Sequence, residues 1–354
     1  MVSVTRRLLA VLLSVLILVA AGCSGKTASN ASQQPPTQGG TTSASPTPVK
    51  IAAFPGSFAS LPVFVANERG LFKKHNLNVT IMDVKGGSQS GQALLAGAVD
   101  FALVAIEEVI SMNAKGKAVQ EVVGGTTRLP FTFIAANKVD LPHAKEGYPA
   151  VIRDLKGLRL GITSKGSSTD YVMRWLLKDA GMDPDKDAKI INAGLQAEAI
   201  AALQSNQIDT YLATDPTTTI ATKVKKIARP VLSIFKGEGP SLLTDYMLNG
   251  LAAQKTYIDS HPEVVKNLYA AIAEADEYIA GLKDESRAKQ AAEELHSEYT
   301  GVDVSTLADI LRNTTELYSP KIDPQMIKNA NTLMKSFGLT DKEFGYEQLV
   351  WQNR

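Results

Sequence analysis

The chain of 354 residues contains one cysteine and four histidines. A single cysteine, Cys23, excludes an intramolecular disulfide, a zinc site built from cysteines and an iron–sulfur cluster. The histidines show no metal-ligand spacing, and Gly-x-Ser-x-Gly and phosphate-loop sequences are absent too. The sequence therefore predicts no enzymatic activity, no metal and no cofactor.

An excess of charge of one sign is lacking as well. The chain has 37 Lys and Arg against 36 Asp and Glu, a formal net charge of +1. No global field would attract nucleic acid or an anionic membrane, and no basic stripe is interleaved with aromatics, so we expect no nucleic-acid partner. The 44% hydrophobic content is ordinary for a soluble globular protein, and the length allows two lobes with separate cores.

An apolar run lies at the N-terminus. Two arginines precede Leu8–Ala21, which Gly22 and Cys23 follow. This order is typical of a secretory signal, and the run is short for a membrane-spanning helix, which needs roughly 20 apolar residues. Ala20–Cys23 resembles a lipobox, with Ala20 where leucine is usual. We predict a lipoprotein signal over residues 1–22 and a lipid on Cys23; the alternative is an ordinary secretory signal with an incidental cysteine.

Residues 23–48 contain almost no large apolar side chain after Cys23. A segment rich in Ser, Thr, Gln, Gly and Pro cannot bury enough surface to offset the entropy of ordering it, so we predict a disordered tether. A lipid followed by a tether predicts a protein anchored at the extracytoplasmic face of a cell membrane.

The folded part opens with a strand–turn–helix–strand unit. Ile51–Phe54 is suited to a buried strand, Pro55–Ser57 to a turn, and Ser60–Gly70 to a helix with Pro62 in its first turn. Val79–Ile81 returns as a strand. The turn lies at the carboxyl edge of the first strand, where open α/β sheets bind small ligands.

A second α/β series begins near residue 154. Leu158–Ile162 is predicted to be a strand, Thr163–Thr169 its turn, and a helix to follow as far as Ala180. Ser167 and Asp170 have the spacing of a capping box at the start of that helix. From residue 245 onward the periodicity is mainly helical, with apolar positions at helical spacing after His261.

Five stretches occur in a characteristic order: Glu68–Val79, Leu95–Ala102, Asp154–Gly161, Leu203–Asp209 with Asp215–Pro216, and His261–Lys266. In this order they resemble the motifs of bacterial solute-binding proteins for nitrate, sulfonates and taurine, a group that includes binders of thiamine pyrimidine precursors. Asn206 stands where glycine is usual, and Asp215 where glutamate is common. The resemblance covers nearly everything from Lys50 onward.

The resemblance implies an α/β protein with the two-lobed fold of type II periplasmic binding proteins. Each lobe would be a mixed sheet flanked by helices, joined by two crossovers and closing over a ligand, with a helical C-terminal part. The first lobe would comprise residues 49–132 and 239–354, and the second lobe residues 133–238.

Several turns where a strand hands over to a helix can point free backbone N–H groups into one cleft. The hydroxyls of the 163–169 turn add donors, although serines there could merely cap their own helix. The predicted ligand-binding residues are Phe54, Ser57, Phe58, Ser88, Gln89, Glu107, Thr126, Arg128, Ser164, Gly166, Ser167, Ser168, Asp215 and Tyr246.

Several of these residues have a structural alternative. Arg128 could grip a sulfonate, nitrate or carboxylate with two parallel hydrogen bonds, or be a surface arginine. Phe54, Phe58 and Tyr246 could wall the cleft or belong to the core, and Asp215 is expected chiefly as a helix cap. Glu107 and Glu108 could form an acid/base pair, but neighbours on a helix do not face each other, which favours a solvated first turn.

These observations predict a monomeric substrate-binding lipoprotein of an ABC importer. It would capture a small anionic or zwitterionic solute between closing lobes, deliver it to a membrane permease and catalyse nothing. One alternative is a binder of a neutral heterocycle such as a thiamine pyrimidine precursor. An enzyme on the same fold, or a surface sensor or adhesin without a small ligand, are alternatives of other classes.

Overall fold

Two five-stranded sheets organise the part of the chain that the computed structural model describes, residues 45–352 except 244, 337 and 339. The predicted signal, Cys23 and most of the tether lie outside these residues. The first strand begins at Thr47, two residues before the predicted start of the first lobe. Within the described residues, no helix combines the length and apolar character needed to cross a membrane.

The first sheet contains strands from both ends of the chain, in the order β2-β1-β3-β10-β4. Strand β1 pairs in parallel with β2 and β3, whereas β10 runs antiparallel between β3 and β4. This mixed sheet defines the first lobe. Its strands are β1 (Thr47–Ala53), β2 (Leu77–Asp83), β3 (Phe101–Ala105), β4 (Val119–Thr126) and β10 (Asn249–Gln254).

The second sheet has the order β7-β6-β8-β5-β9 and defines the second lobe. Strand β6 is parallel to β7 and β8, and β5 lies antiparallel between β8 and β9. The chain enters this sheet after β4 and returns to the first sheet at β10, so two crossovers join the lobes. The strands are β5 (Thr132–Ala136), β6 (Arg159–Ile162), β7 (Lys189–Asn192), β8 (Thr210–Ala213) and β9 (Ala228–Ser233).

The first-lobe helices begin and end largely where the sequence predicts. Pro62 lies in the first turn of α1 (Leu61–Glu68), and Gly70 follows with a φ of 67°, which glycine adopts without strain. A short 3-10 helix, η1 (Phe58–Ser60), precedes α1. The other helices are α2 (Leu71–Lys74), α3 (Gly87–Leu95) and α4 (Ile106–Ala114).

In the second lobe, α6 (Ser168–Asp179) starts without the predicted capping box. The Ser167 hydroxyl donates to the carbonyl oxygen of Ser164 at 2.7 Å instead of capping α6, and Asp170 accepts from the backbone N–H of Gly166 at 2.8 Å. The capping-box prediction is therefore wrong. The other helical segments are α5 (Ala150–Arg153), α7 (Gln196–Gln204), α8 (Thr217–Thr219), the π turn η2 (Ile220–Val224) and η3 (Ile234–Lys236).

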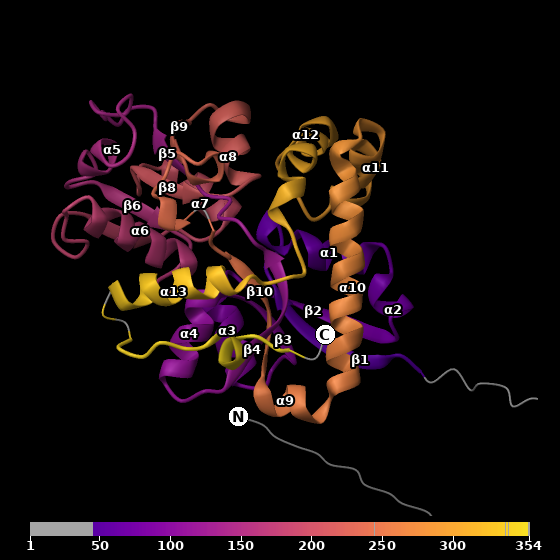
Figure 1. Cartoon of the computed structure of the whole chain (residues 1–354). Coiled ribbons are helices and arrows are strands. Elements are labelled where there is room, and N and C mark those ends of the chain that lie inside the picture. Colours follow the sequence, from indigo (N-terminus) through magenta and orange to yellow (C-terminus); the bar gives the residue numbers. More distant parts are fainter. Residues whose placement is uncertain (1–44, 244, 337, 339, 353–354) are drawn as a thin grey trace, which may run out of the picture. The chain divides into compact units, whose positions relative to one another are not determined.

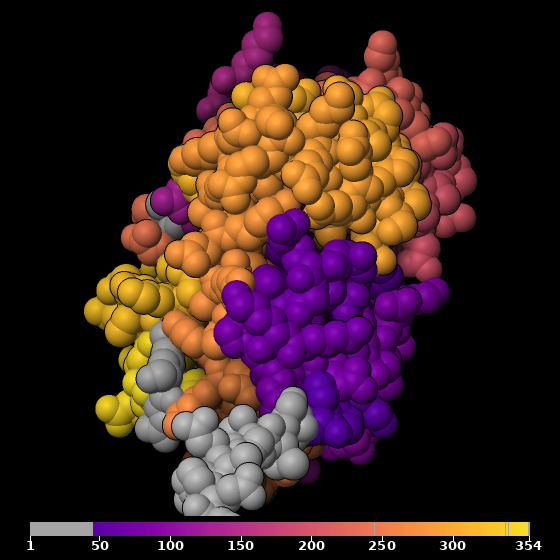
Figure 2. Space-filling model, turned by 90° about the vertical axis from the view of Figure 1, so that its right-hand side faces the viewer, coloured from indigo at the N-terminus to yellow at the C-terminus, as the bar shows by residue number. Residues whose placement is uncertain are grey.

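The C-terminal part is helical, as predicted, and belongs to the first lobe. The long helix α10 (Pro262–Ala280) packs against α1 and α2 (Figure 1). Its buried residues include Leu268, Ile272 and Ile279. Figure 2 shows α10–α12 in orange beside the indigo N-terminal elements. The remaining helices are α9 (Lys255–Ser260), α11 (Glu285–Leu295), α12 (Val304–Thr314), α13 (Pro324–Ser336) and α14 (Tyr346–Leu349), with 3-10 helices η4 (Ser241–Leu243), η5 (Gly281–Lys283) and η6 (Thr315–Leu317).

Candidate functional site

A cavity lies between the two lobes, at the carboxyl ends of their parallel strands. About 60 Å³ of it is open to the centres of water molecules, and the space free of atoms amounts to about 620 Å³ when the open mouth and adjoining solvent are counted. This position is where open α/β sheets bind ligands, and we call the space the interlobe cavity. Its lining is Phe54, Gly56, Ser57, Ala59, Gly86, Gly87, Ala105, Glu108, Leu248 and Asn249 of the first lobe, Phe131 of the crossover, and Thr163, Ser167, Ser168, Thr169, Leu195, Gln196, Tyr211, Leu212, Thr214 and Thr217 of the second lobe.

The turn after β1 supplies one wall of the cavity. Phe54 and Ser57 line it, and the Ser57 hydroxyl also accepts the N–H of Ala59 at 3.3 Å, so this serine caps η1 and faces the cavity at once. Phe58 is not in the lining. Its ring is buried in the core against Tyr299, edge to face, with the ring centroids 4.8 Å apart.

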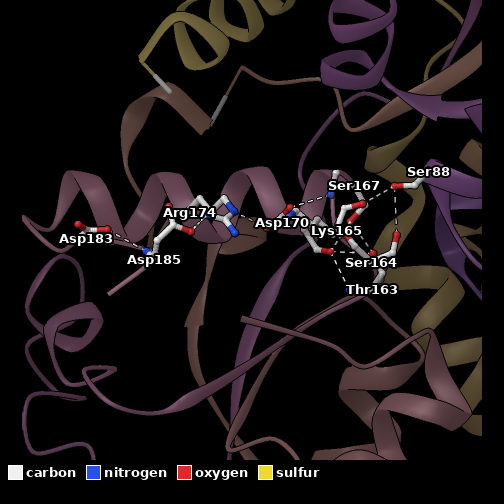
Figure 3. Close-up of polar contacts among 11 residues, drawn as sticks. Ser88, Thr163, Ser164, Lys165, Ser167, Asp170, Arg174, Asp183 and Asp185 are labelled. Atoms are coloured by element: carbon white, nitrogen blue, oxygen red, sulfur yellow. Dashed lines mark hydrogen bonds and ion pairs between the residues drawn. The ribbon is translucent and has the colours of Figure 1, made fainter. Parts of the chain in front are cut away.

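The 163–169 turn supplies the opposite wall through a cluster of hydroxyls (Figure 3). The oxygens of Thr163 and Thr169 lie 2.8 Å apart, and each lies 2.9 Å from the Ser167 oxygen. Thr163, Ser167, Ser168 and Thr169 line the cavity. A hydroxyl can donate or accept, so this wall can adapt to either kind of polar group on a solute.

A polar contact beside the cavity joins the lobes. Ser88 of α3 donates to the carbonyl oxygen of Lys165 at 3.0 Å and accepts from the Ser164 hydroxyl at 3.3 Å (Figure 3). Lys85 forms an ion pair with Glu198 across the same boundary, at 2.8 Å. Ser88 and Ser164, together with Gly166, thus lie near the cavity but outside its lining.

The first turn of α4 carries two buried carboxyls beside the cavity. Glu108 accepts the N–H of Ala105 at 3.1 Å, whereas Glu107 accepts the hydroxyl of Ser168 from the second lobe, also at 3.1 Å. Glu107 is 0% exposed and Glu108 is 6% exposed. The prediction of a solvated first turn is therefore wrong, because the second lobe and the α3 turn cover this end of α4.

Burial changes the protonation of both carboxyls. Desolvation raises the pKa of Glu107 from 4.5 to about 7, against the opposing effect of its hydrogen bonds. Desolvation, with the neighbouring charge of Glu107, raises the pKa of Glu108 to about 8. Near neutral pH this pair therefore holds protons that exposed glutamates would have lost.

A third carboxyl, Glu121 of β4, lies behind this pair. It is fully buried, neither of its oxygens has a hydrogen-bond partner among the described residues, and desolvation raises its pKa well above 4.5. Tyr246 is also buried, outside the cavity lining, and its hydroxyl has no hydrogen-bond partner among the described residues. We refer to Glu107, Glu108 and Glu121 as the acidic cluster.

Two glycines make room for the acidic cluster. A Cβ at Gly87 would lie 2.5 Å from Oε1 of Glu108, and a Cβ at Gly250 would lie 2.8 Å from Oε2 of Glu121. Both distances are closer than packed atoms tolerate. The backbone of α3 and β10 can therefore approach the carboxyls only because these positions lack a side chain.

Glu107 lies beside the cavity but outside its lining, and four further predicted residues also lie outside it. Arg128 is exposed at the start of the crossover. Thr126 is buried, and its N–H donates to Oδ1 of Asn249 at 3.2 Å. Gln89 accepts the N–H of Lys85 at 2.8 Å. Asp215 accepts the N–H and the hydroxyl of Thr219 at 3.0 and 2.7 Å, in keeping with its expected structural role.

The lining includes two aromatic residues that sequence reasoning missed. Phe131 and Tyr211 join Phe54 in the lining, and the Tyr211 hydroxyl donates to the carbonyl oxygen of Gly194 at 2.8 Å. Among the described lining residues there is no lysine, arginine or histidine, and Glu108 is the ionisable acid. In the described ranges no cluster of three or more His, Cys, Asp or Glu side chains is arranged to hold a metal ion.

Comparisons with known proteins agree with this architecture. YtlA of Bacillus subtilis, named as a candidate binding protein, is 25% identical over 310 residues, which are 86% of this chain and 87% of YtlA. A solved structure of a Bordetella bronchiseptica protein is 27% identical with a TM-score of 0.72, covering 87% of this chain and 95% of that one. The alkanesulfonate-binding protein SsuA of Xanthomonas axonopodis, solved with MOPS bound, is 20% identical with a TM-score of 0.67. The match covers 87% of this chain and 99% of SsuA.

The family comparison covers most of the folded part. The model of the NMT1-like family matches residues 42–295, which is more than two thirds of the chain. This range includes β1 to β10 and every residue that lines the interlobe cavity. The chain therefore belongs to the NMT1-like family and has the fold of the type II periplasmic solute-binding proteins.

Proposed function

We propose that the chain is the solute-binding lipoprotein of an ABC importer, which captures a small solute between its lobes and delivers it to a membrane permease. The observation that carries this proposal is the interlobe cavity, which both lobes line at the carboxyl ends of their strands. The likeness to solute-binding proteins adds support. The protein would bind without catalysing a reaction, at the extracytoplasmic face of the membrane.

Capture would proceed by closure of the lobes. Glu107 accepts the hydroxyl of Ser168, and the backbone N–H of Phe58 donates to the carbonyl oxygen of Asp215 at 3.4 Å. Together with the contacts of Ser88 and Lys85 described above, these bonds join the lobes beside the cavity. A solute that touches both walls adds contacts that exist only when the lobes are together. It therefore shifts the population toward the closed form, which a permease can recognise.

The sequence predicts an anionic or zwitterionic solute such as nitrate, a sulfonate or taurine. In this cavity an anion would rely on backbone N–H groups and on the hydroxyls of Ser57, Ser167 and Ser168, without a lysine or arginine in the described lining. The aromatic lining residues Phe54 and Phe131 suit the alternative, a heterocycle. The lining thus supports capture of a small solute and weighs against a bare anion.

A thermal-shift panel with the purified protein tests capture. It would contain nitrate, sulfonates, taurine, aromatic carboxylates and pyrimidines. A solute at about 100 times its dissociation constant should add about 2.7 kcal/mol to the free energy of unfolding. The same solute should reduce the radius of gyration in X-ray scattering, because the lobes close.

Two matched variants test whether the thermal shift arises from solute binding in the interlobe cavity. Ser167→Ala removes a hydroxyl from the lining and should weaken the shift, whereas Ser205→Ala, on an exposed helix end, should leave it unchanged. Turnover of the bound solute would contradict a binding-only role. Native mass spectrometry without any bound solute, together with an unchanged scattering curve across the panel, would contradict capture.

The lipid anchor is tested separately, because Cys23 lies outside the described residues. Replacing Cys23 with alanine should move the protein from the membrane fraction to the soluble fraction, since the thiol is the attachment point of the lipid. Labelled fatty acid should be incorporated into the wild type and not into the variant. Unchanged fractionation would refute the anchor and leave solute capture untouched.

A further inference from the structure

The side chain of Glu108 is part of the cavity lining, and one of its carboxyl oxygens has no hydrogen-bond partner among the described residues. Glu108 lines the cavity, is 6% exposed, and its Oε2 accepts the N–H of Ala105. Its Oε1 is buried and has no hydrogen-bond partner among the described residues. A buried acceptor without a donor costs free energy, and a ligand that supplies the donor removes that cost.

The charges around Glu108 are of one sign. Glu107 lies on the same helix and Glu121 belongs to β4, while the raised pKa values of the nearby Tyr171 and Tyr246 keep their hydroxyls uncharged. The described lining offers no basic side chain to balance them. When these carboxyls ionise, this end of the cavity attracts cations and repels anions.

We propose that the interlobe cavity selects a small organic cation, an amidinium, a guanidinium or a protonated aromatic amine, whose N–H donates to the carboxyl group of Glu108. This inference rests on the proposed function, because it names the class of solute that the same cavity would capture. Charge-assisted hydrogen bonds to a carboxylate are about twice as strong as neutral ones. The aromatic lining residues Phe54 and Phe131 give a flat cation apolar surface, and contact with a ring face adds a cation–π attraction.

Binding of the cation is coupled to release of a proton from Glu108. With the lobes together, as in this structure, Glu108 carries a proton at pH 7, because burial and the charge of Glu107 raise its pKa to about 8. When the cation enters, the O–H bond of Glu108 breaks, the proton goes to solvent, and the N–H of the solute takes its place. The cavity exchanges one positive charge for another, so the acidic cluster is no more strongly charged than before. The empty, protonated form with the lobes together competes with the loaded form and is depleted as pH rises, so the apparent affinity should increase toward about pH 8.

Three compounds of similar size and shape test how the charge of a solute affects its affinity. Benzamidinium, benzamide and benzoate share a ring and differ in carrying a positive charge, no charge or a negative charge. In calorimetric titration, the wild-type protein should bind benzamidinium most tightly, benzamide less tightly and benzoate least. The dissociation constants of benzamidinium and benzamide should differ at least about tenfold. Benzamidinium should bind more tightly at about pH 8.5 than at about pH 6. Buffers of different ionisation enthalpy should report release of a proton.

The variant Glu108→Gln tests the residue itself. Glutamine can still accept the N–H of Ala105 at this helix position, so the cap survives while the charge is lost. The preference for benzamidinium over benzamide should fall at least about tenfold, and the pH dependence should flatten. Glu293→Gln, on the exposed face of α11, should change neither. The pH series on the wild type gives an answer even if Glu108→Gln does not fold.

Three results would overturn the inference. Benzoate binding as tightly as benzamidinium would refute a cation-selective cavity and still support capture of a solute. Equal binding of benzamide and benzamidinium would refute a charged partner for Glu108. Binding of none of the three would refute the ligand class, and native mass spectrometry with scattering would then decide separately whether the cavity captures any solute.

Discussion

Replacing Glu108 with glutamine should make the folded protein less sensitive to alkaline pH. Burial raises the pKa of Glu107 from 4.5 to about 7 and the pKa of Glu108 from 4.5 to about 8. In the unfolded chain both carboxyls return to their ordinary pKa. Between pH 4.5 and about 8 the folded state therefore binds more protons than the unfolded state, so the free energy of unfolding falls as pH rises.

The size of the effect follows from the change in pKa of Glu108. At about 1.4 kcal/mol per pKa unit, the change from 4.5 to about 8 corresponds to roughly 5 kcal/mol of lost stability once this carboxyl ionises in the fold. The loss is absent below pH 4.5 and complete above about pH 8. Because single domains are stable by about 5–15 kcal/mol, this loss is large enough to measure. The glutamine variant lacks this contribution and keeps those of the other buried carboxyls, Glu107 and Glu121 among them.

Urea unfolding at about pH 5, 7 and 9 measures this difference. The fluorescence of Trp175 and Trp351, both buried, should report the transition. From the lowest to the highest pH, the free energy of unfolding of the variant should rise by several kcal/mol relative to that of the wild type. Glu293→Gln, which replaces an exposed carboxyl, should follow the wild type. The reasoning would be refuted if the free energies of unfolding of the wild type and Glu108→Gln changed equally with pH. A wild type that becomes more stable at high pH would refute it too.

Three other substitutions probe separate contacts. Gly87→Ala places a Cβ 2.5 Å from the Glu108 carboxyl and should cost about 1–3 kcal/mol in urea unfolding and weaken solute binding by calorimetry; unchanged binding would contradict the close approach. Phe58→Ala should cost about 3–5 kcal/mol of stability, because this ring is buried; a cost below about 1 kcal/mol would contradict that packing. Lys85→Ala breaks an exposed pair with Glu198, so stability should change by less than about 1 kcal/mol, while stopped-flow measurement should show faster solute release; a slower release would contradict a role in holding the lobes together.

The fold could be predicted because its local signals agree with one another. Pro62 and Gly70 mark the start and end of the first helix region, and the apolar spacing after His261 matches the buried stripe of α10. The order of motifs added the two-lobed arrangement, which no single stretch of sequence reveals. Strand and helix periodicity report which side of an element meets its own core.

The site was harder to predict because it depends on contacts between lobes. Glu107 and Glu108 belong to a first helical turn that is usually solvated, and only the arrival of Ser168 and the α3 turn buries them. Phe131 looks like part of a buried strand, yet it lines the cavity. Arg128 has the right chemistry for an anion but is exposed outside the cavity, because the direction of a side chain near a crossover is not encoded in local periodicity.

The bond between Ser168 and Glu107 connects protonation with closure. This hydrogen bond joins the lobes, so separating them would return water to the first turn of α4 and lower the pKa of Glu107 and Glu108 toward 4.5. Lobes that close without a solute must therefore take up protons above pH 4.5. Lobes that close on a cation do not need those protons, because the ligand supplies the positive charge. Under the proposed selectivity, raising the pH thus penalises the empty closed form more than the loaded one, and a cation becomes increasingly the condition for closure.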